Sequence, residues 1–271
     1  MTIFGYYIES YYLYVVLVLP CVIWAMIAQI RVQSAYSTYS RVRALRGLTG
    51  AEVAERILRS QGITNVAVAS CRGNLSDHYD PRSNTVFLSE GVYGSSSVAA
   101  CGIAAHECGH AIQHAQGYAP LRLRSALIPV TNIGSNLAIP LIIIGLLISS
   151  ATYESNVGYY IAIAGVLCFA TATVFQLVTL PVEFNASRRA LSVLESEGIV
   201  SSDEKRGVRK VLWAAAMTYV AALAVSLANL LRLLIIVMGG RNKRRRVRRR
   251  FYRCKSLKRT ESIQTSSFPR Q

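Results

Sequence analysis

The chain has 271 residues, 52% of them hydrophobic, and a formal net charge of +16. Evenly scattered hydrophobic residues would suit one or two water-soluble domains, but here they are concentrated in long uncharged runs. The charge is also uneven, because residues 241–271 hold 13 of the 30 Lys and Arg residues and a single acidic residue. The rest of the chain is only mildly basic, so we do not expect nucleic acid to be a partner.

Three runs have the length of membrane-spanning helices and contain no Asp, Glu, Lys or Arg: residues 11–30, 125–150 and 157–181. The first has no basic segment before it and is too long for a cleaved signal peptide, so we interpret it as a retained anchor. The other two are separated by a short polar loop, which predicts a transmembrane hairpin. The chain is therefore expected to contact the lipid bilayer.

A fourth apolar region, residues 211–238, is harder to interpret. It contains Arg232 and an Ala-rich first half, and a single crossing there would place the basic tail on the outer side. A helix that covers a site in the polar part of the chain, an interfacial helix, a helical hairpin and a plain fourth span all stay open. Four Arg residues between residues 31 and 46 follow the first span, so the positive-inside tendency places residues 31–124 and 182–210 in the cytoplasm.

Between the first two long apolar runs, the sequence predicts a small mixed domain. The hydroxyl of Thr49 and the carboxylate of Glu52 form a capping-box pattern for a helix that continues to about Ser60. Two β-rich segments follow, residues 65–69 and 85–89, and then a helix over residues 97–116. The expected fold class is mainly α, with a small β-sheet, an N-terminal anchor and a transmembrane helical hairpin.

The six cysteines form no CxxC pair, and two of them lie in predicted spans. This pattern indicates neither a disulfide framework nor a thiolate zinc site.

The run HECGH contains the residues of a zinc peptidase site. Residues four apart lie on one face of a helix, so His106 and His110 can bind one Zn²⁺ ion. Glu107 lies beside them, where its carboxylate can take a proton from water as a general base. A chance match is less plausible here because unpaired polar side chains would be costly in an otherwise apolar helix.

Catalytic zinc sites usually have three protein ligands. His114 is a candidate by helical phase, but it lies two turns from His106. Glu183 is the better candidate, because it begins a polar helical segment that returns to the same side of the membrane. The alternative is that Glu183 only forms a surface ion pair with Arg188 or Arg189.

Three motifs resemble the YugP-like neutral zinc metallopeptidases of bacterial membranes, and the resemblance covers about residues 5–238. They are DHYDPR (residues 77–82), AAHECGHAIQHAQGYAPL (104–121) and LPVEFNASRRAL (180–191). The resemblance implies zinc bound by His106, His110 and Glu183, a catalytic Glu107, and a multi-pass protein of the bacterial plasma membrane. The positive-inside tendency places its active site on the cytoplasmic side.

More distantly, the chain is similar to gluzincin peptidases, which implies a core built around the HExxH helix. The membrane-bound members carry an ExxxD motif, whose Asp usually orients a zinc-binding histidine. Here the fourth residue after Glu183 is Ser187. We expect Ser187, Asn185 or another group to take that role.

The sequence therefore predicts a membrane-embedded zinc endopeptidase that acts on a protein or peptide substrate. A non-catalytic, zinc-stabilised scaffold or partner-binding protein is the alternative. The expected organisation begins with an anchor (residues 1–30) and the first half of a cytoplasmic peptidase domain (31–124). A transmembrane hairpin follows (125–181), then the second half of the domain with the apolar helix or fourth span (182–238). A disordered basic tail ends the chain (239–271).

Three finer hypotheses concern other residues. His78 and Asp80 could stabilise the tetrahedral intermediate, or they could simply form a turn. Strand 85–89 could be an exposed edge to which a substrate adds by β-pairing. The basic tail could contact anionic lipids, since each Lys or Arg near such a surface contributes about 1 kcal/mol.

Overall fold

The computed structural model describes residues 11–151 and 155–265, and the side chains up to residue 239. Helices make up most of this chain, as predicted, and three short strands form one sheet. In chain order the elements are a π-helical stretch Tyr14–Val18, α2 Leu19–Tyr39, α3 Gly50–Ser60, β1 Ala67–Cys71, β2 His78–Asp80, β3 Thr85–Ser89, α4 Glu90–Tyr93, α5 Val98–Ala115, α6 Ala119–Ala151, α7 Val157–Ser196 and α8 Ser202–Thr265.

The bounds of α3 and α5 agree with those predicted from the residues at their ends. Both hydrogen bonds of the predicted capping box are present between Thr49 and Glu52, and the helix ends at Ser60 before Gly62, whose φ of +69° favours glycine. α5 begins after its N-cap Ser97 and ends at Ala115, within a residue of the predicted bounds. These confirmed predictions depend on contacts within a few residues of each helix end.

The sheet differs from the prediction in one respect that matters for function. Its strand order is β1-β3-β2, with β3 parallel to β1 and antiparallel to β2. β3 is therefore the central strand, and the hypothesis that residues 85–89 form an exposed edge is wrong. Strand β2 lies in the segment that the sequence indicated as a turn, because three residues between turn signals carry no readable periodicity.

The chain forms two compact units, each assembled from separate parts of the sequence. Unit 2 contains Leu19–Thr131 and Thr173–Leu227, and unit 1 contains Asn132–Ala172 with the described residues of 1–18 and 228–271. Long helices run from one unit into the other. The segment boundaries predicted from the sequence are not tested by this division and stay predictions.

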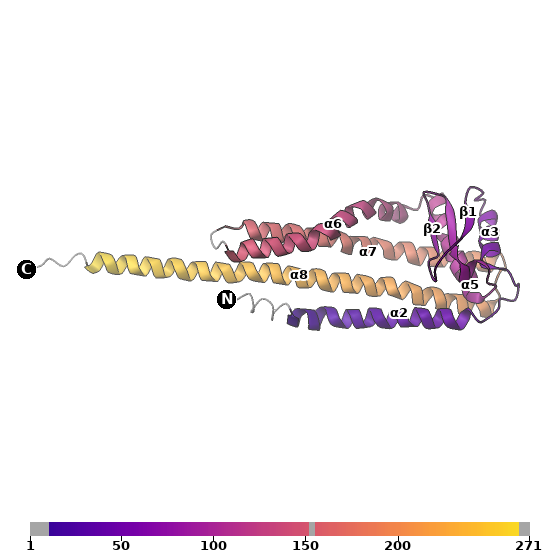
Figure 1. Ribbon diagram of the computed structural model, residues 1–271, viewed down its shortest axis with the longest axis horizontal. Helices are drawn as coiled ribbons and strands as arrows, with labels where there is room; N and C mark the ends of the chain where they lie inside the picture. The colour runs from indigo at the N-terminus through magenta and orange to yellow at the C-terminus, as the bar shows by residue number, and fades with distance from the viewer. Residues whose placement is uncertain (1–10, 152–154, 266–271) are drawn as a thin grey trace, which may run out of the picture. The chain divides into compact units, whose positions relative to one another are not determined.

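The core of unit 2 forms where α3, α5 and the sheet pack together (Figure 1). Val53, Ala54, Ile57 and Leu58 recur at helical spacing and bury one face of α3 against α5. The first half of α5 consists almost entirely of small buried residues, so neighbouring elements can approach its backbone closely. This packing holds the helix that carries the HECGH run in a fixed position.

The backbone of α7 approaches α5 closely at Gly109. A Cβ atom placed on Gly109 would lie 2.6 Å from the carbonyl oxygen of Ala186, where backbone atoms have to shift. We expect Gly109→Ala to lower the free energy of unfolding by about 1–3 kcal/mol, as overpacking usually does. Thermal unfolding in detergent measures this loss. The matched control is Gly94→Ala, because nothing lies within 4 Å of that position; equal unfolding temperatures for the two variants would contradict the prediction.

Among the described residues, four helices are long and apolar enough to cross a membrane: Tyr11–Tyr39, Ala119–Ala151, Val157–Ser196 and Ser202–Gly239. The three predicted spans are among them. The fourth belongs to α8, which is one continuous helix, so the expected alternative of a helical hairpin within residues 211–238 is wrong. α8 also includes much of the basic segment for which the sequence predicted disorder.

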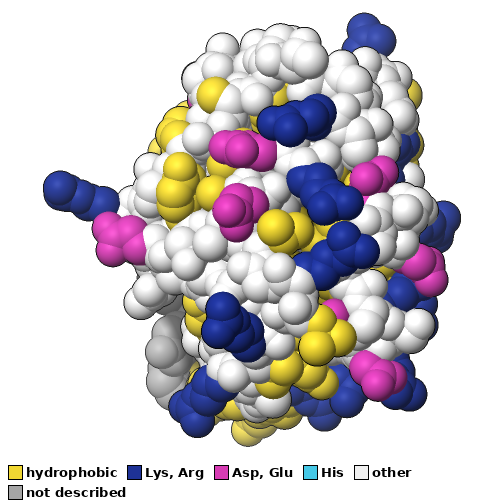
Figure 2. Space-filling model, turned by 90° about the vertical axis from the view of Figure 1, so that its right-hand side faces the viewer, with side chains coloured by type: hydrophobic (Ala, Val, Ile, Leu, Met, Phe, Trp, Pro, Cys, Tyr) yellow, Lys and Arg dark blue, Asp and Glu magenta, His cyan; other side chains and the backbone are white. Residues whose placement is uncertain are grey.

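Unit 2 carries a water-compatible surface beside α3 and the sheet. Figure 2 shows Lys and Arg mixed with Asp and Glu over this face, with hydrophobic side chains only in scattered patches. Charges of both signs are typical of protein surface in water rather than in lipid.

Candidate metal centre

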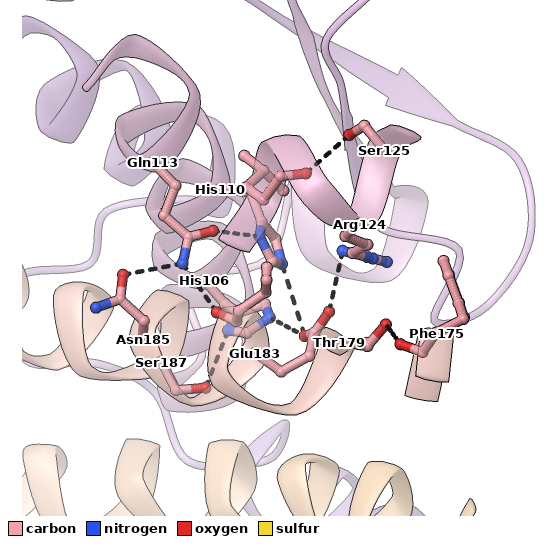
Figure 3. Close-up of polar contacts among 12 residues, drawn as sticks. His106, His110, Gln113, Arg124, Ser125, Phe175, Thr179, Glu183, Asn185 and Ser187 are labelled. Carbon is pink, nitrogen blue, oxygen red and sulfur yellow. Dashed lines mark hydrogen bonds and ion pairs between the residues drawn. The ribbon is translucent and has the colours of Figure 1, made fainter. Parts of the chain in front are cut away.

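Two helices of unit 2 bring together the three residues that the sequence singled out as metal ligands. His106 and His110 project from one face of α5, and Glu183 projects toward them from α7 (Figure 3). Oε2 of Glu183 lies 3.3 Å from Nε2 of His106 and 3.6 Å from Nε2 of His110. One potential ligand atom from each residue lies within 4.8 Å of the other two.

This arrangement fits a zinc ion. Bonds of about 2.0–2.1 Å in a tetrahedral site place neighbouring ligand atoms about 3.3–3.4 Å apart. The two distances from Glu183 to the histidines agree with that spacing. Two imidazoles and one carboxylate are also a donor set that catalytic zinc sites use, with the fourth position left open.

Hydrogen bonds at the other ring nitrogens orient both histidines. Gln113 donates through Nε2 to the carbonyl oxygen of Val182 and to Oδ1 of Asn185, so its Oε1 faces Nδ1 of His110 at 3.1 Å and accepts a hydrogen bond from it. In the neutral imidazole, a proton on Nδ1 leaves Nε2 as the nitrogen that can bind a cation. Sequence analysis did not select Gln113, although its position three residues after His110 places it on the same helical face.

Ser187 contacts the other histidine, at the position where related motifs carry Asp. Its Oγ lies 3.2 Å from Nδ1 of His106. A hydroxyl in this position can accept a hydrogen bond from Nδ1–H, so that Nε2 is the nitrogen that would bind a metal ion. Unlike a carboxylate, it carries no charge that would increase the basicity of the ring. Of the groups that the sequence offered for this role, Ser187 contacts His106 directly, and Asn185 acts on the other histidine, His110, through Gln113.

We expect Ser187→Ala to weaken zinc binding by roughly 10- to 100-fold, the usual effect of removing a group that orients a ligand. Competition with a chromophoric chelator measures the zinc dissociation constant. Ser196→Ala is the matched control, because Ser196 lies on the same helix and bonds only to the carbonyl oxygen of Val193. Ser187→Asp should bind zinc at least as tightly as the original protein. If both substitutions at Ser187 left zinc affinity unchanged, the serine would have no orienting role.

Glu183 is only 2% exposed and has partners besides the histidines. Its Oε1 lies 3.3 Å from Nη1 of Arg124, and Tyr219 lines the same two cavities as Glu183. The alternative of a surface ion pair with Arg188 or Arg189 is therefore wrong. Arg189 instead donates to Oδ1 of Asn185 at 2.7 Å, which extends the network that orients the histidines.

Arg124 is a further site residue that sequence analysis missed. It lies near the start of α6, in a run that the sequence showed only as the polar flank of a predicted span. Its Nη1 binds Glu183, while its Nε is buried and has no hydrogen-bond partner in the described part of the chain. Arg124 thus offers an unused donor at the edge of the site.

Glu107 lies beside the three candidate ligands and is 8% exposed. Burial raises the pKa of its carboxyl to about 7, and the nearby charges of Glu183 and Asp77 act in the same direction. His106 and a hydrogen bond with the backbone amide of Tyr79 oppose that increase without cancelling it. The carboxyl therefore titrates near neutral pH, where a group that takes up and releases protons is most effective.

The remaining candidates have structural partners. Nδ1 of His114 lies 2.8 Å from the hydroxyl of Tyr79, and His114 is outside the metal-binding group, so the alternative that it is the third ligand is not supported. Asp80 accepts hydrogen bonds from the next turn, as a turn residue does. His78 stacks on Phe87 with ring centroids 5.0 Å apart.

Asp77, which the sequence did not select, joins the DHYDPR segment to the sheet. Its carboxylate accepts hydrogen bonds from the backbone amide and the hydroxyl of Ser89, at the end of β3. This contact fixes the segment that lies over the site.

Two cavities of unit 2 meet at the site. One of about 280 Å³ lies between α2, α5 and α8, and the other of about 520 Å³ lies between β2, α5 and α6. Both are lined by Asp77, His106, Glu107, Glu183 and Tyr219. Six α8 residues between positions 211 and 219 line the first of these cavities. Whether residues 211–238 cover the site or cross the membrane stays a prediction.

Comparisons with known proteins give the family of the chain. The profile of a family described as "Putative neutral zinc metallopeptidase" matches residues 14–238. The "Putative membrane protease YugP" of Bacillus subtilis (strain 168) is 46% identical over 216 residues, which cover 80% of this chain and 92% of that protein. No solved structure matches the chain.

The predicted family resemblance is thereby confirmed, and zinc is the cofactor that both the family and the donor set indicate. With its four helices of spanning length, the chain is a membrane protein and a member of this neutral zinc metallopeptidase family.

Proposed function

We propose that the protein is an endopeptidase that cleaves membrane or membrane-proximal polypeptides, with His106, His110 and Glu183 as zinc ligands and Glu107 as the general base. The observation that supports this most directly is the convergence of three ligand atoms within 4.8 Å beside a buried carboxyl group. A site that only stabilised the fold would have no need of that carboxyl group.

Zinc, when bound, supplies a Lewis acid that polarises the scissile carbonyl and activates water at neutral pH. The carboxylate of Glu107 would take the proton of the attacking water and pass it to the leaving amine. Its raised pKa suits both transfers. The Arg124 side chain lies against Glu183 and would hold its carboxylate toward the two histidines.

We also propose that the site faces the cytoplasm of a bacterial cell, in a multi-pass protein of the plasma membrane. The Arg residues that follow the first span and those near Glu183 support this orientation. The charged face of unit 2 is compatible with an aqueous compartment (Figure 2).

The test is peptide cleavage by the purified protein in detergent, with quenched fluorescent peptides as substrates. We expect the zinc-loaded protein to cleave them, removal of zinc with a chelator to abolish cleavage, and added Zn²⁺ to restore it. Bound zinc is measured in parallel by atomic absorption. Cleavage that survives full zinc removal would contradict the proposal, and a fully zinc-loaded protein without cleavage would favour the scaffold alternative.

A further inference from the structure

The two cavities that meet at the metal centre differ in chemistry. Apart from the five residues that they share, the cavity between α2, α5 and α8 has no charged residue in its lining among the described residues. Its walls are mostly apolar or small, with Val32, Ile103, Leu212 and Ala215 among them. Seven of its eleven unshared lining residues are apolar, and the other four are Gln29, Tyr36, Ser187 and Thr218. The apolar majority favours an apolar side chain.

The second cavity contains two arginines. The residues that it shares with the first cavity include three carboxylates, Asp77, Glu107 and Glu183, and the rest of its described lining contains Arg122 and Arg124 and no Asp or Glu. Arg122 is exposed at the rim, and Nε of Arg124 is buried without a partner in the described structure. Nη1 of Arg124 already binds Glu183, so Arg122 at the rim is the arginine with which an entering carboxylate would form a charge-assisted hydrogen bond first.

We propose that the protein selects polypeptides with an apolar residue on one side of the scissile bond and an acidic residue on the other. The apolar side chain occupies the cavity between α2 and α8, and the acidic side chain lies between Arg122 and Arg124. This inference rests on the proposed peptidase function, because both cavities open onto Glu107 and the candidate ligands.

The two linings also suit a substrate at a membrane surface. Gln29, Val32 and Tyr36 lie toward the end of the first candidate span, and Ala215 and Tyr219 lie in the fourth. An apolar residue where a membrane segment ends could enter between these helices, while the acidic residue beside it stays in water. The substrate class is therefore a polypeptide that changes from apolar to acidic across the cleaved bond.

The wild-type test uses matched quenched peptides with Leu or Asn on one side of the central bond and Glu or Lys on the other, in both chain orders. We expect the Leu/Glu peptide, in one order, to have a kcat/KM about tenfold or more above its Asn and Lys counterparts. Cleavage with rates that differ by less than about twofold across the set would overturn the inference but not the peptidase function.

Variants of each cavity test the assignment of the two sides. Ala215→Phe should fill the apolar cavity and lower kcat/KM for Leu peptides about tenfold more than for peptides with Ala in its place. Ala214→Phe is its control, because Ala214 lines neither cavity. Ala215→Leu is a smaller change for the case that the Phe variant unfolds. If filling this cavity slowed all peptides equally, it would not hold the apolar residue.

Arg122→Glu should shift the preference from Glu toward Lys peptides, while the same change at Arg59, on the far helix α3, should not. An unchanged preference for Glu in Arg122→Glu would overturn the assignment of the second cavity.

Binding separates failure of this inference from failure of the proposed function. Fluorescence anisotropy of the labelled peptides is measured with zinc-loaded Glu107→Gln, which retains both cavities. The same order of affinities is expected there, with Leu/Glu peptides bound most tightly. If wild type cleaved no peptide but this order of affinities held, the peptidase proposal would fail and the two-sided recognition would stand.

Discussion

Replacing Glu107 with Gln is expected to lower the rate of peptide cleavage by roughly 10²- to 10⁴-fold, the contribution typical of a positioned general base. The amide has nearly the same shape but cannot take up the proton of the attacking water. The variant should bind as much zinc as the original protein, because Glu107 does not belong to the three residues whose ligand atoms converge. Single-turnover cleavage and atomic absorption on the same preparation measure the two quantities.

A matched control separates the loss of the base from a general effect of the substitution. Glu55→Gln makes the same chemical change at an exposed position on α3 and should leave cleavage unchanged. Retained activity in Glu107→Gln would mean that another group takes the proton. A loss of zinc together with activity would instead show that Glu107 contributes to the metal site itself.

The sequence predicted those parts of the fold that neighbouring residues determine. The capping box at Thr49 and the N-cap at Ser97 are local contacts, and both helices begin where these residues stand. The candidate ligands could also be selected from the sequence, because helical spacing places His106 and His110 on one face. Glu183 followed from its place after a predicted hairpin that returns the chain to the same side.

What the sequence could not show depends on contacts between distant segments. Arg124 is 59 residues from Glu183 along the chain, and the sequence contains no pattern that joins the two. The position of β3 between β1 and β2 was also hidden, since a strand of three residues shows no alternation that predicts pairing. Gln113 could have been found from its spacing. Which of its amide atoms faces His110 is determined only by the hydrogen bonds that Gln113 donates to Val182 and Asn185.

Replacing Glu183 with Ala is expected to have the second large effect, on the metal rather than on proton transfer. Removing a ligand should weaken zinc binding by more than the roughly 10- to 100-fold expected for a group that only orients a ligand. Glu183→Gln should lose zinc affinity too, because an amide oxygen is neutral. Zinc competition titrations compare these variants with His114→Ala, which should keep its zinc since His114 pairs with Tyr79 instead. Zinc binding lost in His114→Ala and retained in Glu183→Ala would reverse the assignment.

The stability of the metal-free protein provides an independent measure of the same contact. Glu183→Ala leaves Arg124 without its carboxylate partner in a partly buried position, and breaking a fully buried pair costs about 3–5 kcal/mol. With 29% of the Arg124 side chain exposed, the loss should be smaller than that. Glu195 lies on α7, like Glu183, and forms an exposed ion pair with Lys205 of α8. Glu195→Gln removes this pair and should cost at most about 1 kcal/mol. A greater loss of unfolding free energy in Glu183→Ala than in Glu195→Gln would therefore show that Arg124 and Glu183 act as a buried pair that holds the carboxylate in place before zinc binds.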